Sequence, residues 1–250
     1  MTEISVGVQL YSVREDCARD LPGTLAAISK IGYTGVEFAG YYDRSAQELR
    51  KLLDDHGLRC CGTHARLDTL LGDALKKTIE FNQALGNPYL IVPALPEERR
   101  NSIDAWRSTG FLFSELAEKV RPYQMRVGYH NHAVEFKPLH GQIPFDIFFQ
   151  AAGKEVIMQL DLGNAAHGGA NPIEYLKRYA SQAVTVHLKE YSAVNPKAWI
   201  GQGEISWQEV FEVCETNEVT TWYIVEQESY AVPPLEAIAK CREALRRMGK

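Results

Sequence analysis

Eight short segments rich in β-branched and aromatic residues alternate with helix-compatible stretches along this 250-residue chain. In the intervening stretches, apolar residues recur at spacings of three and four, which is typical of amphipathic helices. The alternation therefore predicts repeated strand–helix units. The predicted strands are residues 5–10, 35–39, 59–65, 89–94, 126–132, 156–161, 184–189 and 223–228.

The number of units decides between an open and a closed parallel sheet. Eight units in about 250 residues match the size of a (β/α)8 barrel, whereas an open doubly wound sheet usually has fewer strands or a longer chain. No Gly/Ser-rich linker, low-complexity tract or block of like charges interrupts the series. The sequence therefore predicts the α/β class and a single TIM barrel domain over residues 1–250.

Residues at the ends of several helical stretches support these boundaries. The pairs Ser45 with Glu48 and Ser206 with Glu209 have the spacing of a capping box. In this motif the hydroxyl of the first residue and the carboxylate of the second each accept a hydrogen bond from the other residue's backbone N–H. Pro172 fits the first turn of a helix. We expect helices to begin at these three positions.

Composition limits the partners and the location of the protein. The formal net charge is −5, which disfavours nucleic acid as a partner. No run approaches the roughly 20 apolar residues that cross a bilayer, and no basic and apolar leader opens the chain, so we expect a cytoplasmic protein without membrane contact. The five cysteines form no CxxC pair and are expected to be reduced packing residues. A homodimer is an open alternative to a monomer.

The active site of a TIM barrel lies where the carboxyl ends of the strands meet the following loops. In this chain, nearly every predicted strand ends in a group that can bind a metal ion or move a proton. These groups are Gln9, Tyr11, Arg14, Glu37, His64, His130, His132, Glu135, Asp161, Asn164, His167, His187, Lys189, Glu190, Glu226 and Glu228.

Strand parity predicts that three of these side chains converge. Residues two apart on a strand face the same way, and on this basis Asp161, His187 and Glu226 are expected to meet on the barrel axis. A divalent cation would relieve the repulsion between their carboxylates. Oxygen and nitrogen ligands without a thiolate suit Mn²⁺, Mg²⁺, Co²⁺ or Zn²⁺. One such ion is the expected cofactor.

A fourth ligand is expected from the segment that follows residues 126–132. Glu135 competes there with His130 and His132. We favour Glu135 because an anionic oxygen suits a hard cation. This choice requires the loop after the strand to fold back toward the axis.

Eight motifs spread over the whole chain carry a resemblance to a known family. They are GVQLYSVRE, GYTGVEFAG, GTHA, GYHNHAVEF, QLDLGNAAHGGANP, VHLKEY, GQGEISWQEV and WYIVEQE, in this order. Together they resemble the xylose-isomerase-like TIM barrels of sugar phosphate isomerases, epimerases and type IV endonucleases, in particular the subgroup marked by YHNH..EF.

The resemblance implies a set of metal ligands. In that family a divalent metal is held by a Glu of strand 5, an Asp of strand 6, a His of strand 7 and a Glu of strand 8. The last three roles fall on Asp161, His187 and Glu226. At strand 5 the sequence departs from the epimerases, because HNH stands where they have a Glu followed by Asn, and Glu135 lies downstream.

The resemblance also implies an activity on a small molecule. It is that of a metal-dependent isomerase or epimerase of a sugar or sugar phosphate, which removes a proton next to a carbonyl and forms a metal-stabilised enediolate. Glu135 and Glu226 are the expected acid–base pair, and Lys189 is expected to neutralise an oxyanion or a phosphate. The expected substrate-binding residues are Tyr11, Glu37, His64, His130, His132 and Asn164.

Three alternatives accompany this hypothesis. A lyase or hydratase could use the same enolate chemistry on 3-keto sugars or 3-keto glycosides. A metal-dependent endonuclease would need a basic groove for DNA, which the sequence does not suggest. A non-catalytic sugar-binding barrel is expected to have lost metal ligands, which are largely present here.

Overall fold

Eight parallel strands, each paired with its neighbours in sequence, close into a ring in which β1 pairs with β8. The computed structural model describes residues 3–250. The predicted (β/α)8 barrel is therefore confirmed. The strands are β1 (Ser5–Gln9), β2 (Gly35–Phe38), β3 (Arg59–His64), β4 (Tyr89–Val92), β5 (Arg126–His130), β6 (Ile157–Asp161), β7 (Thr185–Leu188) and β8 (Trp222–Val225).

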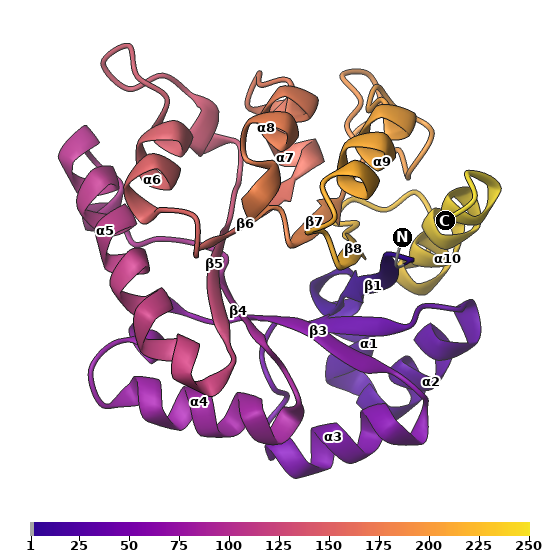
Figure 1. Ribbon diagram of the computed structural model, residues 1–250. Coiled ribbons are helices and arrows are strands. Elements are labelled where there is room, and N and C mark those ends of the chain that lie inside the picture. The colour runs from indigo at the N-terminus through magenta and orange to yellow at the C-terminus, as the bar shows by residue number, and fades with distance from the viewer. Residues whose placement is uncertain (1–2) are drawn as a thin grey trace.

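The helices surround the ring of strands (Figure 1). Apolar residues on their inner faces pack against the outward-facing side chains of the strands, such as Val36 and Leu188, in one large buried cluster. The α-helices are α1 (Arg14–Arg19), α2 (Leu21–Ile31), α3 (Ala46–Asp55), α4 (Ala74–Leu85), α5 (Ile103–Val120), α6 (Pro144–Ala152), α7 (Leu162–His167), α8 (Pro172–Arg178), α9 (Trp207–Thr216) and α10 (Pro234–Arg247). Among the described residues, none of these helices is both long and apolar enough to span a membrane.

The structure refines the predicted helix starts. The capping box of Ser45 and Glu48 is formed in both directions at the start of α3, and Pro172 occupies the first turn of α8. The second predicted capping box is wrong, because the Ser206 hydroxyl donates to the Glu209 carboxylate instead of accepting a backbone N–H. The five cysteines are free and buried, as expected.

The interior of the barrel has an apolar part and a polar part. Cys61 and Ile224 pack inside the ring in one small cluster, and Ile91 and Ile157 pack in another. The carboxyl ends of the strands instead carry buried polar groups. The apolar clusters thus close the barrel below a polar layer. The members of that layer include Gln9, Glu37, Gln159, Asp161 and His187.

A register shift in β3 places His64 in the polar layer. Val36 pairs with Cys60, but the next residue of β2, Glu37, pairs with Gly62. This bulge lets Cys61 face the interior while His64, three residues later, does so as well. The side chain of Thr63 lies on the other face and bonds with Asn82 and Asn87 of the α4 region.

Candidate active site

His187 lies between two carboxylates at the centre of the polar layer. Its Nδ1 is 2.6 Å from Oε2 of Glu226, and its Nε2 is 2.6 Å from Oε2 of Glu37. Burial alone would lower the pKa of His187, but Glu37 and Glu226 outweigh it and raise the pKa to about 10. Without a metal ion, both ring nitrogens of His187 therefore have an anionic partner.

Glu37 organises this layer and is fully buried. Its carboxylate accepts hydrogen bonds from Gln9 and Gln159, each at 2.7 Å, and His64 Nε2 lies 3.2 Å from its Oε2. Burial would raise the pKa of Glu37, but the charges of His64 and His187 lower it well below its usual range. Since protein groups engage both oxygens, this geometry suits a positioning residue rather than the substrate contact expected from the sequence.

Gln159 connects two histidines to this network. Its amide nitrogen donates to Glu37 and, at 3.0 Å, to Thr185 Oγ1, so its amide oxygen faces the histidines. That oxygen lies 3.0 Å from His64 Nε2 and 3.1 Å from His130 Nδ1. Because a carbonyl oxygen only accepts hydrogen bonds, we assign a proton to each of these two nitrogens. His130 then keeps a free lone pair on Nε2.

The four side chains of His130, Asp161, His187 and Glu226 can hold a metal ion. Each offers one ligand atom, and these atoms all lie within 4.8 Å of one another. Within residues 3–250, the buried Oδ2 of Asp161 has no hydrogen-bond partner; His130 Nε2 is 4.0 Å away and Lys189 Nζ 3.8 Å. A buried carboxylate oxygen that accepts no hydrogen bond is costly, so a cation fits here. We call these four residues the metal group.

An overlapping set of histidines is less suited to a metal ion. His64, His130 and His187 also satisfy the distance criterion. This set contains no carboxylate to balance the charge of a divalent cation, and the Nε2 of His64 is already engaged by Gln159 and Glu37. The donor set of the metal group, two carboxylates and two imidazoles, suits the same divalent ions as were expected from the sequence.

The structure does not bring Glu135 to the metal group. Its Oε1 accepts a hydrogen bond of 2.5 Å from the Tyr129 hydroxyl, and its Oε2 accepts one of 2.8 Å from the backbone N–H of His132. Tyr129 packs on the outer side of β5, against Trp106 and Phe113 of α5. The loop therefore folds outward, in contrast to our expectation, and His130 takes the fourth place in the metal group.

Lys189 lies beside the metal group. It pairs with Glu228 and is close to the free oxygen of Asp161. Burial would lower the pKa of Lys189, but Asp161, Glu226 and Glu228 outweigh it and raise the pKa above its usual value. Lys189 is therefore a fixed cation next to the candidate metal site, where the sequence led us to expect one.

Two asparagines hold the strand ends that carry the site. Asn131 donates to the carbonyl of Asp161 and accepts from its backbone N–H, at 3.2 and 2.9 Å. Asn164 donates its backbone N–H to Asp161 Oδ1 at 2.6 Å, and its side chain donates to Asn131 O at 3.3 Å. Asn164 is thus engaged by the protein rather than aimed at the main cavity. The sequence analysis missed Asn131, although its place between two histidines at a strand end was a usable signal.

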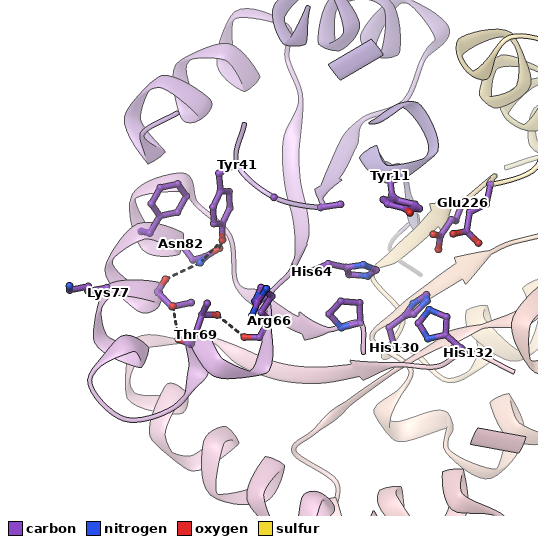
Figure 2. A pocket seen from close by; sticks show the side chains of 17 residues that line it. Tyr11, Tyr41, His64, Arg66, Thr69, Lys77, Asn82, His130, His132 and Glu226 are labelled. Atoms are coloured by element: carbon purple, nitrogen blue, oxygen red, sulfur yellow. Dashed lines mark hydrogen bonds between the residues drawn. The ribbon is translucent and has the colours of Figure 1, made fainter. Parts of the chain in front are cut away.

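A cavity of about 690 Å³ opens next to the metal group. Figure 2 shows Tyr11, His64, His130, His132 and Glu226 together on one side of it. Four of the six predicted substrate-binding residues therefore line this cavity. Asn164 and Lys189 line a smaller cavity of about 250 Å³, and Glu37 lines neither of the two.

Two curated relatives are similar to this chain in sequence. The rhizopine catabolism protein MocC of Rhizobium meliloti is 23% identical over 66% of this chain, and the match spans 56% of that relative's length. The inosose dehydratase of Clostridium botulinum is 21% identical over 86% of this chain and 85% of its own length.

Solved structures share the fold over nearly the whole chain. A sugar phosphate isomerase/epimerase from Parabacteroides distasonis superposes with a TM-score of 0.85 at 23% identity, over 98% of this chain and 94% of that one. The IolI protein, solved with a bound zinc atom, has a TM-score of 0.74 at 16% identity, over 98% and 97% of the two chains. The family model described as "Xylose isomerase-like TIM barrel" matches residues 25–248. The resemblance to the xylose-isomerase-like TIM barrels is thus confirmed at the level of the family, and the chain belongs to the family of xylose isomerase-like TIM barrels.

Proposed function

We propose that this protein is a divalent-metal-dependent enzyme that removes a proton from the carbon next to a ketone in a sugar or cyclitol. The metal group carries the proposal, because its four ligand atoms lie within 4.8 Å of one another and because the buried Oδ2 of Asp161 has no hydrogen-bond partner within residues 3–250. A zinc atom in the structure of IolI and the names of the relatives, an inosose dehydratase and an isomerase/epimerase, support it.

The protein side chains would divide the work as follows. His130, Asp161, His187 and Glu226 would hold the ion, which when bound polarises a ketone oxygen and stabilises negative charge on it. Glu37 would orient His187 through Nε2, and Gln159 would orient His130 through Nδ1, as is common for metal-binding histidines.

Proton abstraction needs a base that lines the cavity. Glu226 meets this condition and has one carboxylate oxygen beside His187. It would accept the proton while the C–H electron pair moves onto the ketone oxygen. Lys189, fixed next to Asp161, would stabilise the oxygen charge of the resulting enolate.

The position of Glu135 bears on the fate of the enolate. Epimerisation needs a second acid–base group on the opposite face of the substrate, and Glu135, expected from the sequence to serve there, is held by Tyr129 on the outer side of β5. Elimination needs instead an acid to protonate the leaving group, and His64 and His132 both line the cavity near Glu226. We therefore favour loss of water or another β-leaving group, with isomerisation or epimerisation as the second candidate.

Proton exchange in heavy water tests the shared first step. The metal-loaded protein is incubated with a panel of keto sugars, inososes and sugar phosphates, and NMR follows deuterium uptake and product. We expect deuterium to enter next to the ketone of at least one member, and the product to separate elimination from epimerisation. No exchange in any member, combined with nicking of DNA that contains apurinic sites, would favour the endonuclease alternative.

A further inference from the structure

The cavity beside the metal group extends well beyond it. Figure 2 shows Tyr41, Thr69, Lys77 and Asn82 on the side opposite Glu226, with His64 between the two ends. The full volume of about 690 Å³ lies within the range of about 300–1,000 Å³ that is typical of pockets for drug-sized ligands. A single sugar ring is smaller than such a ligand. We call the part lined by Ala39, Tyr41, Ala65, Thr69, Lys77, Thr78, Phe81, Asn82 and Pro93 the outer subsite.

Polar groups of the outer subsite are bonded to one another. The Asn82 amide donates to Tyr41 Oη at 3.0 Å and to the carbonyl of Thr78 at 2.8 Å. The hydroxyls of Thr78 and Thr69 each donate to a backbone carbonyl at 2.7 Å. Sugar hydroxyls placed here would lose their water without gaining these donors, which is unfavourable.

The remaining surface of the outer subsite is apolar and partly aromatic. The rings of Tyr41 and Phe81 are in contact, with centroids 4.1 Å apart. Ala39, Ala65 and Pro93 complete the lining. Ring faces and small apolar groups of this kind favour a flat hydrocarbon or aromatic ligand.

Charges at the rim do not form a phosphate site. The Arg66 guanidinium is held by Asp68 through two hydrogen bonds of 3.1 and 2.8 Å. Lys77 has no ion-pair partner within residues 3–250 and is the cation left at this end. One exposed lysine without further converging donors is a weak anchor for a dianion.

We propose that the outer subsite binds a flat, apolar substituent carried by the substrate, so that the substrate is a substituted ring compound rather than a free sugar or a sugar phosphate. The inference rests on the proposed function, because the ring bearing the ketone would occupy the end of the cavity next to the metal group. Phe81 is the specificity-determining residue, and Tyr41 supports it.

Paired glycosides test this inference through binding, without turnover. Calorimetry on the metal-loaded protein compares methyl and phenyl glycosides of glucose, galactose and mannose, together with glucose and glucose 6-phosphate. At least one phenyl glycoside is expected to bind about tenfold more tightly than its methyl partner, with a more negative heat-capacity change. The phosphate ester is expected to gain nothing over glucose.

Variants test whether Phe81 causes the preference for phenyl over methyl glycosides. Phe81→Ala should reduce it to about twofold, and Phe81→Leu, which keeps most of the volume but removes the ring, should reduce it to an intermediate value. Phe111→Ala is the matched control, because Phe111 is an exposed phenylalanine of α5 outside the cavity. Thermal unfolding verifies that each variant is folded.

The outcomes separate this inference from the proposed function. Any one of four results would contradict the proposed role of the outer subsite. They are equal binding of the methyl and phenyl partners, a phenyl preference that persists in Phe81→Ala, tightest binding of glucose 6-phosphate, and no binding of any glycoside. Deuterium exchange with an unsubstituted keto sugar would still support the proposed function in those cases. Conversely, a phenyl preference lost in Phe81→Ala, without exchange in any panel member, would support the subsite and contradict the chemistry.

Discussion

Gln159 and His130 share a hydrogen bond of 3.1 Å that assigns the ring proton of His130 to Nδ1 and leaves its Nε2 facing Asp161. Gln159, a neutral residue of β6, thus selects the tautomer of His130 on β5 in which Nε2 has a lone pair for a metal ion. It also gives His130 a form that could bind a metal ion at the place where the resemblance implied a glutamate.

Removal of the Gln159 amide should weaken metal binding without removing a ligand. In Gln159→Leu, His64 and His130 lose their shared acceptor, and we expect metal affinity to fall by about 10–100-fold. Competition with a chelator measures the affinity, and ¹⁵N shifts of the His130 ring report its tautomer. Thr185→Val is the control, because it removes only another contact of the Gln159 amide. Unchanged affinity and an unchanged His130 tautomer in Gln159→Leu would contradict the assignment.

Asp161→Asn should separate metal binding from folding. The variant keeps an oxygen for the backbone N–H of Asn164 but removes the carboxylate charge, whose Oδ2 has no hydrogen-bond partner within the described chain and lies 3.8 Å from Lys189 Nζ. We expect the metal-free variant to unfold at the same or a higher temperature than the metal-free parent. The stabilisation by metal, about 2.7 kcal/mol at 100 times the Kd for the parent, should disappear. A large loss of metal-free stability would show that the carboxylate has a structural partner instead.

Glu135→Gln should lower the stability of the protein and leave its metal affinity unchanged, in contrast to Asp161→Asn. Its carboxylate accepts from Tyr129 and from the backbone of His132, and hydrogen bonds to charged groups contribute about 1.5–3 kcal/mol. We expect stability to fall by an amount in that range while metal affinity stays within about twofold. Denaturant unfolding and a double-mutant cycle with Tyr129→Phe measure the coupling. Loss of the metal in Glu135→Gln would restore the ligand assignment expected from the sequence.

Lys189→Met should lower the rate of the reaction more than it lowers the metal affinity. The lysine neighbours Asp161 but is not in the metal group, so we expect metal affinity to change little. The rate of deuterium exchange should fall by about 10²–10³-fold, because the enolate oxygen loses its fixed cation. Lys119→Met, at an exposed lysine of α5 outside both cavities, is the control and should keep the rate. An equal effect of both variants would argue against the role of Lys189.

The fold and three members of the metal group could be predicted from the sequence. Strand alternation gave eight strands with ends correct to within three residues. Asp161 and His187 lie within or at the end of their strands, where the two-residue period determines direction. Glu226 directly follows β8 and continues its direction.

The fourth position could not be predicted because Glu135 lies beyond the end of β5. Its direction depends on the buried hydroxyl of Tyr129, which faces the helices and needs an acceptor. The direction of His64 on β3 could not be predicted for a similar reason. The bulge at Cys61 interrupts the two-residue alternation of side chains along this strand. In both cases contacts between elements, rather than local periodicity, decide where the side chain points.

Anomalous diffraction from crystals soaked with Mn²⁺ or Zn²⁺ tests the central claim most directly. The account predicts one strong peak within coordination distance of His130, Asp161, His187 and Glu226, with Glu135 still bonded to Tyr129. A peak elsewhere, a site that includes Glu135, or no peak in crystals of protein that binds the ion in solution would contradict it.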